Sequence, residues 1–313
     1  MVAGSLVRAL PRAPLVPAAR LVPSSTGSGS VLSVDPTTVG HEADERQRGE
    51  VVTIPVRPGA GRAGTRPAAV DPLAALLDLP GVRDAAEAAR SGIDRLLRHR
   101  LMRNRSAEVS TESALRGARA SAALEGVDVP LADLRAGQVD DPVVQGSLRT
   151  SVALGSMVDT WSRAPGQVLA RLHVLAAADL TDRAGLGRPG AHAGPRLGGL
   201  FSLVTGDSSV PAVVLAAVVH GELAAVAPFG TADGVVARAA ARLTGISRGQ
   251  DPKAVSVPEV GFAELGREEY ARTLAGYGSG QPDGVAAWLV HCCRATEHGA
   301  LEGLAIAEAL LRG

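Results

Sequence analysis

The sequence is poor in aromatic side chains, in lysine and in cysteine. Aromatic residues make up 2% of the chain, Lys253 is the single lysine, and Cys292 and Cys293 are the two cysteines. Adjacent cysteines have Cα atoms about 3.8 Å apart, which is too close for an unstrained disulfide. The absence of a disulfide framework predicts a reducing, cytoplasmic location. The scarcity of lysine among many Ala, Gly and Arg indicates a GC-rich bacterial genome, so a single arginine carries little information.

The chain also lacks net charge and long apolar segments. It has 32 basic and 32 acidic residues, so no overall field attracts nucleic acid or an anionic membrane. A basic cluster at 95–105 has no interleaved aromatic residues and is interpreted as a solvated helix end. The longest apolar run, 210–219, is too short to span a bilayer. We therefore expect neither a nucleic-acid partner nor a membrane partner.

The first 70 residues differ in composition from the rest of the chain. They are rich in Pro, Gly, Ser, Thr and Arg, with one short apolar patch at 51–56. Such a segment buries too little apolar surface to offset the entropy of ordering. Residues 1–70 are predicted to form a disordered arm ahead of one helical domain at 71–313. Residues 1–34 lack the apolar core of an export signal, so we interpret them as part of the arm or as sequence ahead of a later start codon.

Apolar residues recur at spacings of three and four from Val82 to Leu101, which is typical of an amphipathic helix. A second helix is expected at about 112–125, beginning near Thr111 or Ser113. Further helices are expected at 144–162, 166–179, 211–227, 233–244, about 267–276 and 284–311. No segment shows the alternation of a strand, and 182–199 is predicted to be a long loop because of its Gly, Pro and Arg. The predicted fold class is mostly α.

The stretch VAPFGTADGVVAR, residues 226–238, joins two of these helices. The first helix stops at Pro228 and the next begins near Asp233, so backbone N–H groups at a helix N-terminus are free to bind an anion. An ordinary turn in which Phe229 anchors the core is the alternative on local physics alone.

The order of residues in this loop resembles the central helix–loop–helix of the Fic (fido) family, whose usual loop reads HPFxDGNGRxxR. Pro228, Phe229, Gly234 and Arg238 coincide with the family's proline, phenylalanine, second loop glycine and last arginine. The resemblance implies a Fic fold over about 80–311. It also implies a relation to enzymes that transfer AMP, or another phosphate-containing group, from a nucleotide to a protein hydroxyl.

A second segment supports the resemblance. The sequence SAALEG at 121–126 is similar to the family's inhibitory pattern [S/T]xxxE[G/N], here at the end of the helix expected at about 112–125. The resemblance implies that Ser121 and Glu125 are inhibitory and that Glu125 pairs with Arg238. We expect the Glu125 carboxylate within ~4 Å of the Arg238 guanidinium, with Ser121 one turn earlier on the same face.

The residues that carry the family's chemistry are replaced. The general base falls on Ala227, the magnesium-binding acid on Thr231 and the first phosphate-binding arginine on Val235. Asp233 stands where the family has an asparagine, and its carboxylate is expected to repel a phosphate. His220 falls where many members have a helix histidine, but it precedes Ala227 by seven residues, which correspond to about 10 Å along the helix axis. It is therefore too far away to replace the missing base.

We therefore expect a degenerate Fic-fold protein, a pseudoenzyme that acts as a binding or regulatory module and needs no cofactor. The alternative is a divergent nucleotidyltransferase that uses ATP with Mg²⁺ and a non-standard base to modify protein hydroxyls. A nucleotide, if bound, would contact Phe229, Gly230, Asp233, Gly234 and Arg238. The partner is expected to be a protein, either an unidentified one or a second copy of the chain.

No metal site is expected. His291, Cys292, Cys293 and His298 suggest zinc by their residue types alone. On one helix, however, these spacings point the side chains in different directions, whereas zinc requires ligands that converge. The better interpretation is a set of buried helix residues.

Overall fold

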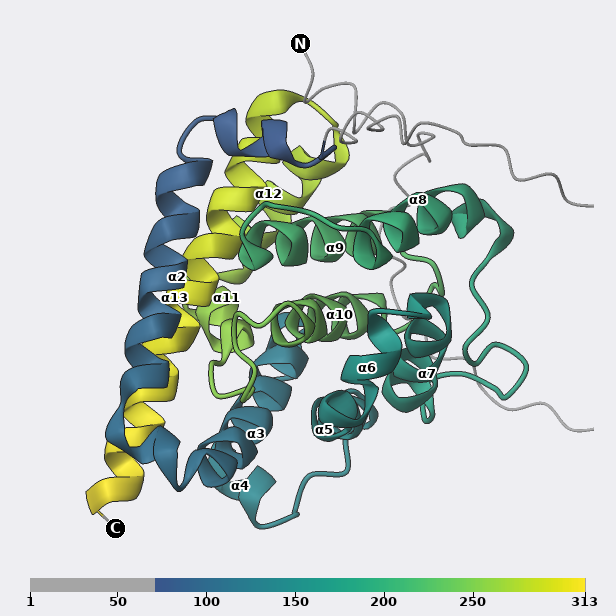
Figure 1. Ribbon diagram of the computed structural model, residues 1–313. Coiled ribbons are helices and arrows are strands. Elements are labelled where there is room, and N and C mark those ends of the chain that lie inside the picture. The colour runs from purple at the N-terminus through teal and green to yellow at the C-terminus, as the bar shows by residue number, and fades with distance from the viewer. Residues whose placement is uncertain (1–70, 313) are drawn as a thin grey trace, which may run out of the picture. The chain divides into compact units, whose positions relative to one another are not determined.

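Figure 1 shows the computed structural model of the protein, which describes residues 71–312. Within this range every regular element is a helix, in agreement with the predicted fold class. The α-helices are α2 (Val82–Arg98), α3 (Ser106–Leu124), α4 (Leu131–Arg135), α5 (Pro142–Ala153), α6 (Val158–Trp161), α7 (Pro165–Ala177), α8 (Gly194–Thr205), α9 (Ala212–Val226), α10 (Asp233–Ser247), α11 (Pro258–Leu265), α12 (Arg267–Gly278) and α13 (Pro282–Arg312). The 3₁₀ helices are η1 (Ala74–Asp78), η2 (Arg100–Arg103), η3 (Leu154–Met157) and η4 (Ala191–Ala193).

Helix α9 is the central element. Its sequence, AVVLAAVVHGELAAV, is apolar around almost its whole circumference, and a helix of this kind is stable in water only when it is surrounded by protein. It packs against α8, α10, α12 and α13. Figure 1 shows α9 and α10 side by side, and the six-residue connection at 227–232 makes them antiparallel. This pair holds the loop that the sequence singled out.

The two polar side chains on α9 are both paired. Glu222 is 2% exposed and accepts hydrogen bonds from Arg196 of α8 and from Tyr277 of α12, at 2.7 and 2.8 Å. His220 pairs with Tyr270 of α12. A buried charge without partners is costly, so these contacts fix how α8 and α12 lie against the central helix.

Helices α2 and α13 form a long parallel pair along one side of the molecule (Figure 1). Small residues let the backbones approach, since a Cβ at Gly92 would lie 3.5 Å from the Cβ of Ala300. Near the ends of the pair, His99 Nε2 lies 3.0 Å from Glu308 Oε1. The few aromatic residues serve as core anchors, because the indoles of the fully buried Trp161 and Trp288 donate to Thr244 and to the carbonyl of Ala217.

Several expected boundaries are wrong. The helix expected at about 112–125 is α3, which begins earlier, at Ser106, and ends at Leu124. Ser113 is not a cap but a fully buried residue whose hydroxyl donates to the carbonyl of Val255, 2.8 Å away. The helix expected at 144–162 is interrupted by η3 after α5. Tertiary contacts of this kind override local capping signals.

The loop expected at 182–199 is also partly wrong, since η4 and the first part of α8 lie within it. Pro195 occupies the first turn of α8, where its missing N–H group has no helical partner to lose. Helix α11, which packs mainly against α13 and α3, was not predicted. The arm predicted at 1–70 lies outside the described residues. Between residues 71 and 312, no helix combines the length and the hydrophobicity needed to span a lipid bilayer.

Candidate functional site

The loop between α9 and α10 reverses the chain through left-handed backbone conformations. Ala227 has a φ of 46° and Ala232 a φ of 51°, although both carry a side chain. The N–H of Ala227 donates to the carbonyl of Leu223 at 2.9 Å and so ends α9. Non-glycine residues in this conformation are strained and persist only when the surroundings hold them. The loop is therefore fixed by its contacts and not by local preference.

Asp233, the first residue of α10, fills the inside of the loop. Its Oδ1 accepts a hydrogen bond from the N–H of Phe229 at 2.9 Å. Burial raises the pKa of Asp233 to about 6, against the opposing effect of the N–H groups of Phe229 and Gly230, and the charge of Glu125 adds to the rise. The backbone donors that would attract a bound anion thus already face a carboxylate of the chain itself.

Glu125, directly after the end of α3, reaches the same place from the other side. Its Oε1 lies 2.6 Å from Nη2 of Arg238, within the distance expected from the sequence, and its side chain is 33% exposed. A Cβ at Gly234 would collide with the Glu125 carboxylate. The Glu125 carboxylate therefore packs directly against Gly234, and a side chain at this position would displace it.

Arg238 is enclosed and is hydrogen-bonded through all three guanidinium nitrogens. Nε donates to the hydroxyl of Ser121 at 3.0 Å, Nη2 to the carbonyl of Ser121 at 3.0 Å, and Nη1 to the hydroxyl of Tyr270 at 3.4 Å. Burial opposes the charge, but Tyr270 and Glu125 outweigh it, so the pKa of Arg238 lies above its ordinary value. With the bond to Glu125, this arginine is committed to α3 and α12.

His220 belongs to a buried aromatic cluster and does not face the loop. Its Nε2 lies 2.7 Å from the hydroxyl of Tyr270, and its ring packs edge-on against Phe262 and Trp288 at centroid distances of 5.0 and 4.9 Å. Burial, with the charge of Arg238 next in importance, holds the pKa of His220 well below its ordinary value. The imidazole is neutral and inaccessible, in keeping with the conclusion that it cannot replace the missing base.

The positions where the Fic family carries its chemistry have no charged group. Ala227 and Thr231 are partly buried, and Val235 is 4% exposed and belongs to the main hydrophobic core. A valine in the core is a packing residue, so Val235 contributes to the hydrophobic core of the fold.

Sequence reasoning missed the part that His173 plays in this site. Its ring, on α7, stacks on Phe229 with centroids 4.1 Å apart and planes within 5°. Its Nδ1 accepts a hydrogen bond from the N–H of Gly187 at 2.9 Å, and burial lowers its pKa. A single histidine on an apolar helix face was the available signal, but nothing local connects it with a loop more than fifty residues away.

The glycine-rich segment after α7 covers the loop. The N–H of Gly190 donates to the carbonyl of Pro228 at 2.8 Å, and Nε2 of the exposed His192 lies 3.3 Å from the carbonyl of Val226. Among the described residues, this segment contains the short helix η4 and no strand.

The zinc interpretation has no support from the geometry. His291, Cys292 and Cys293 are buried on α13, and His298 lies 2.9 Å from Glu264. No group of three or more His, Cys, Asp or Glu side chains with metal-binding geometry occurs among residues 71–312.

Comparisons with known proteins identify the fold. By sequence, no family profile and no curated protein matches the chain. By structure, it is similar to a Fic family protein from Desulfovibrio desulfuricans G20, with a TM-score of 0.59 and 17% identity over 72% of this chain and 74% of the other. It is also similar to a fragment of Fic-1 from C. elegans, with a TM-score of 0.57 and 17% identity over 73% of each chain. The protein has the Fic fold.

Proposed function

We propose that this Fic-fold protein does not transfer nucleotides and acts as a binding or regulatory module. The observation that carries the proposal is the position of two carboxylates. Asp233 accepts from the loop N–H groups, and Glu125 lies against Gly234 and pairs with Arg238. An anionic ligand in this loop would have to displace both.

The residues present do not fit ATP with Mg²⁺. A hard dication prefers carboxylate ligands, whereas the family's metal position holds the neutral hydroxyl of Thr231. Arg238, the remaining cation of the motif, has its donors committed to Ser121, Glu125 and Tyr270. Ala227 has no atom that accepts a proton. The loop would thus lack a ligand for the metal, a free cation for the phosphates and a base for the transfer.

Thermal shift with ATP, ADP, GTP and CTP, each with and without Mg²⁺, tests binding. Ligand binding to the folded state raises the melting temperature by mass action, so we expect no nucleotide to produce a magnesium-dependent rise. The matched control is the variant Thr231→Asp with Asp233→Asn, which supplies a metal ligand and removes the repelling charge. A rise in the control alone supports the proposal, and a rise in the wild type contradicts it.

Transfer of AMP to protein hydroxyls is tested by incubating the protein with labelled ATP and a bacterial lysate. We expect no labelled product from the wild type or from Glu125→Gly, which frees Arg238 from its carboxylate. A variant that restores the family's residues in the loop should keep Val235, because an arginine at this buried core position would be destabilising. A labelled product from either protein would overturn the proposal.

The alternative, a divergent transferase that modifies protein hydroxyls with AMP from ATP, has one observation in its favour. His192 is exposed and lies beside the end of α9, where the family's base would be. If Nε2 donates to the carbonyl of Val226, Nδ1 is left as a proton acceptor. Under this alternative, labelling is present in the wild type and lost in His192→Ala.

A further inference from the structure

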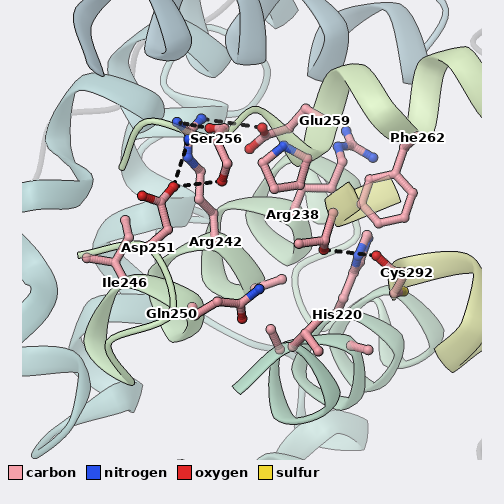
Figure 2. A pocket seen from close by; sticks show the side chains of 17 residues that line it. His220, Arg238, Arg242, Ile246, Gln250, Asp251, Ser256, Glu259, Phe262 and Cys292 are labelled. Carbon is pink, nitrogen blue, oxygen red and sulfur yellow. Dashed lines mark hydrogen bonds and ion pairs between the residues drawn. The ribbon is translucent and has the colours of Figure 1, made fainter. Parts of the chain in front are cut away.

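The positive charge of Arg238 is balanced by one carboxylate. Figure 2 shows Arg238 at a cavity of about 50 Å³ between α9, α10, α11 and α13. The two acids that line this cavity, Asp251 and Glu259, gather around Arg242, and Glu259 pairs with it at 3.3 Å. In the described part of the chain, Glu125 provides the single carboxylate within ion-pair distance of Arg238.

Glu125 is the member of this pair that can move. Its side chain is 33% exposed, whereas Arg238 is 3% exposed and keeps hydrogen bonds to Ser121 and Tyr270 whether or not the carboxylate is present. Glu125 also stands directly after the last residue of α3, so its side chain is not enclosed by a further helical turn. Any exchange of partners in this pair is therefore a movement of the carboxylate.

A second arginine lies beside Glu125. Arg267 is the first residue of α12, and its guanidinium packs on Gly126, the residue that follows Glu125. A Cβ on Gly126 would lie 3.5 Å from Nη2 of Arg267 and 3.7 Å from its Nη1. Arg267 is exposed, and among the described residues it makes no ion pair and no side-chain hydrogen bond. It is thus a cation without a carboxylate, next to a carboxylate that can move.

The side chains of Glu125 and Arg267 are within reach of each other. Neighbouring Cα atoms are about 3.8 Å apart, so Nη2 of Arg267 lies at most about 9 Å from the Cα of Glu125. Three C–C bonds and one C–O bond carry the glutamate oxygens over more than half of this distance. The exposed arginine, with its long flexible stem, covers the rest. An ion pair between the two therefore needs rotation of side chains and no movement of either helix.

We propose that Arg267 is a second partner of Glu125, and that the carboxylate moves from Arg238 to Arg267 when the site opens. In the closed arrangement, which the structure shows, Glu125 neutralises the buried Arg238. In the open arrangement it pairs with Arg267 at the surface. A buried charge without a partner is costly, so the open arrangement is populated only where the carboxylate is displaced from Arg238. This exchange deepens the proposed regulatory function and rests on it, but it does not depend on which ligand binds.

Gly234→Ala provides a protein in which the carboxylate is displaced without a ligand. A Cβ at Gly234 would collide with Oε1 of Glu125, so the methyl group moves the carboxylate from its place on Arg238. Arg267→Gln then removes the charge of the second partner and keeps most of its side chain. The matched control is Arg294→Gln, at an exposed arginine of α13 that also makes no ion pair among the described residues.

The measurement is the equilibrium constant for urea unfolding of the full chain at low salt. We expect Arg267→Gln to raise this constant by less than twofold in the wild type and by about fivefold in Gly234→Ala, where the exposed pair has formed. The excess should disappear in 1 M NaCl, because salt screens an exposed pair. Arg294→Gln should have the same effect in both backgrounds. If Arg267→Gln also has equal effects in both, Arg267 only covers Gly126 and the proposal is overturned.

A second cycle does not need Gly234→Ala to fold. Arg267→Glu places a like charge beside Glu125, so it should raise the unfolding constant about threefold more than Arg267→Gln does. In a Glu125→Gln background the two substitutions should be equivalent. A difference that persists without the charge of Glu125 would show that the two side chains do not interact, and would overturn the proposal. Neither cycle involves a nucleotide, so these results and those of the nucleotide-binding test can fail independently.

Discussion

Two buried arginines on α10, one turn apart, make ion pairs of different character. Arg238 is 3% exposed, but its partner Glu125 has a side chain that is 33% exposed, and their closest atoms are 2.6 Å apart. Arg242 and Glu259 are both enclosed, with side chains 5% and 6% exposed, and lie 3.3 Å apart. The first pair has every guanidinium nitrogen bonded, whereas Nε of Arg242 is unpartnered.

The comparison distinguishes the Arg238–Glu125 pair, which can open to solvent, from the Arg242–Glu259 pair, which is buried in the core. Solvent reaches Glu125, so the carboxylate can leave Arg238 and be hydrated, and Arg238 keeps its bonds to Ser121 and Tyr270. Glu259 has no such exit, and its loss leaves a charge in the interior. The pair of Glu125 and Arg238 is thus the one whose carboxylate can move into solvent, whereas the pair of Glu259 and Arg242 is enclosed on both sides.

The largest expected effect comes from one substitution made at both pairs. Glu259→Gln should lower the free energy of unfolding by about 3–5 kcal/mol, because Arg242 is left buried with a neutral partner. Glu125→Gln should lower it by less, about 2 kcal/mol, because solvent reaches this carboxylate although Arg238 itself is buried. Urea unfolding followed by fluorescence of the buried Trp161 and Trp288 measures both. Equal losses would contradict the distinction between the pairs.

The next effect is a pH dependence of the folding stability, which arises from Asp233 beside Glu125. Because the pKa of Asp233 is about 6 in the fold against 3.8 ordinarily, folding favours the protonated acid. Its contribution to stability is fully present below pH 3.8 and is lost as the pH rises through 6. This corresponds to at most about 3 kcal/mol.

The measurement compares urea unfolding of the wild type with that of Asp233→Asn from pH 4 to pH 8. The wild type should lose stability relative to the variant as the pH rises. Glu125→Gln should reduce this loss, because the charge of Glu125 contributes to the raised pKa of Asp233. Glu259→Gln should leave it unchanged. A pH-independent difference between wild type and Asp233→Asn would show that Asp233 is ionised normally.

A smaller effect tests the contact between Glu125 and Gly234. Gly234→Ala should destabilise the wild type by about 2 kcal/mol, because the new methyl group displaces the Glu125 carboxylate. In a Glu125→Gly background the same change should be neutral or stabilising, since the obstruction is gone and alanine favours the helix. Thermal unfolding of the wild type, the two single variants and the double variant gives the coupling free energy between the two positions. Additive effects would contradict the predicted contact.

The smallest effect concerns Ser121. Ser121→Ala removes the hydroxyl that accepts from Arg238 Nε at 3.0 Å but leaves the carbonyl bond to Nη2. We expect a loss of about 1 kcal/mol in the free energy of unfolding. The change should be additive with Glu259→Gln, because the two sites share no partner. A loss of 3 kcal/mol or more would show that the Ser121 hydroxyl provides most of the stabilisation of the pair between Glu125 and Arg238.

Sequence reasoning located the loop and its inhibitory-type partner through the order of a few residues. Pro228, Phe229, Gly234 and Arg238 fall in a spacing that resembles one family, and Glu125 precedes a glycine at a helix end. That pattern correctly predicted which side chains meet across 113 residues. It failed for α8, where glycine and proline content indicated a loop, and for the start of α3.

By itself, the sequence determined the helical fold class, which follows from periodicity, a local property. The pairing of Glu125 with Arg238 was predicted from the resemblance of two short motifs to one family, and the structure brings the two side chains together. Only the tertiary structure decided that Asp233 turns into the loop, that His173 stacks on Phe229, that Val235 joins the core and that Arg242 borders a cavity. Such facts depend on packing between segments far apart in the chain, and the pattern of any one segment does not specify its neighbours.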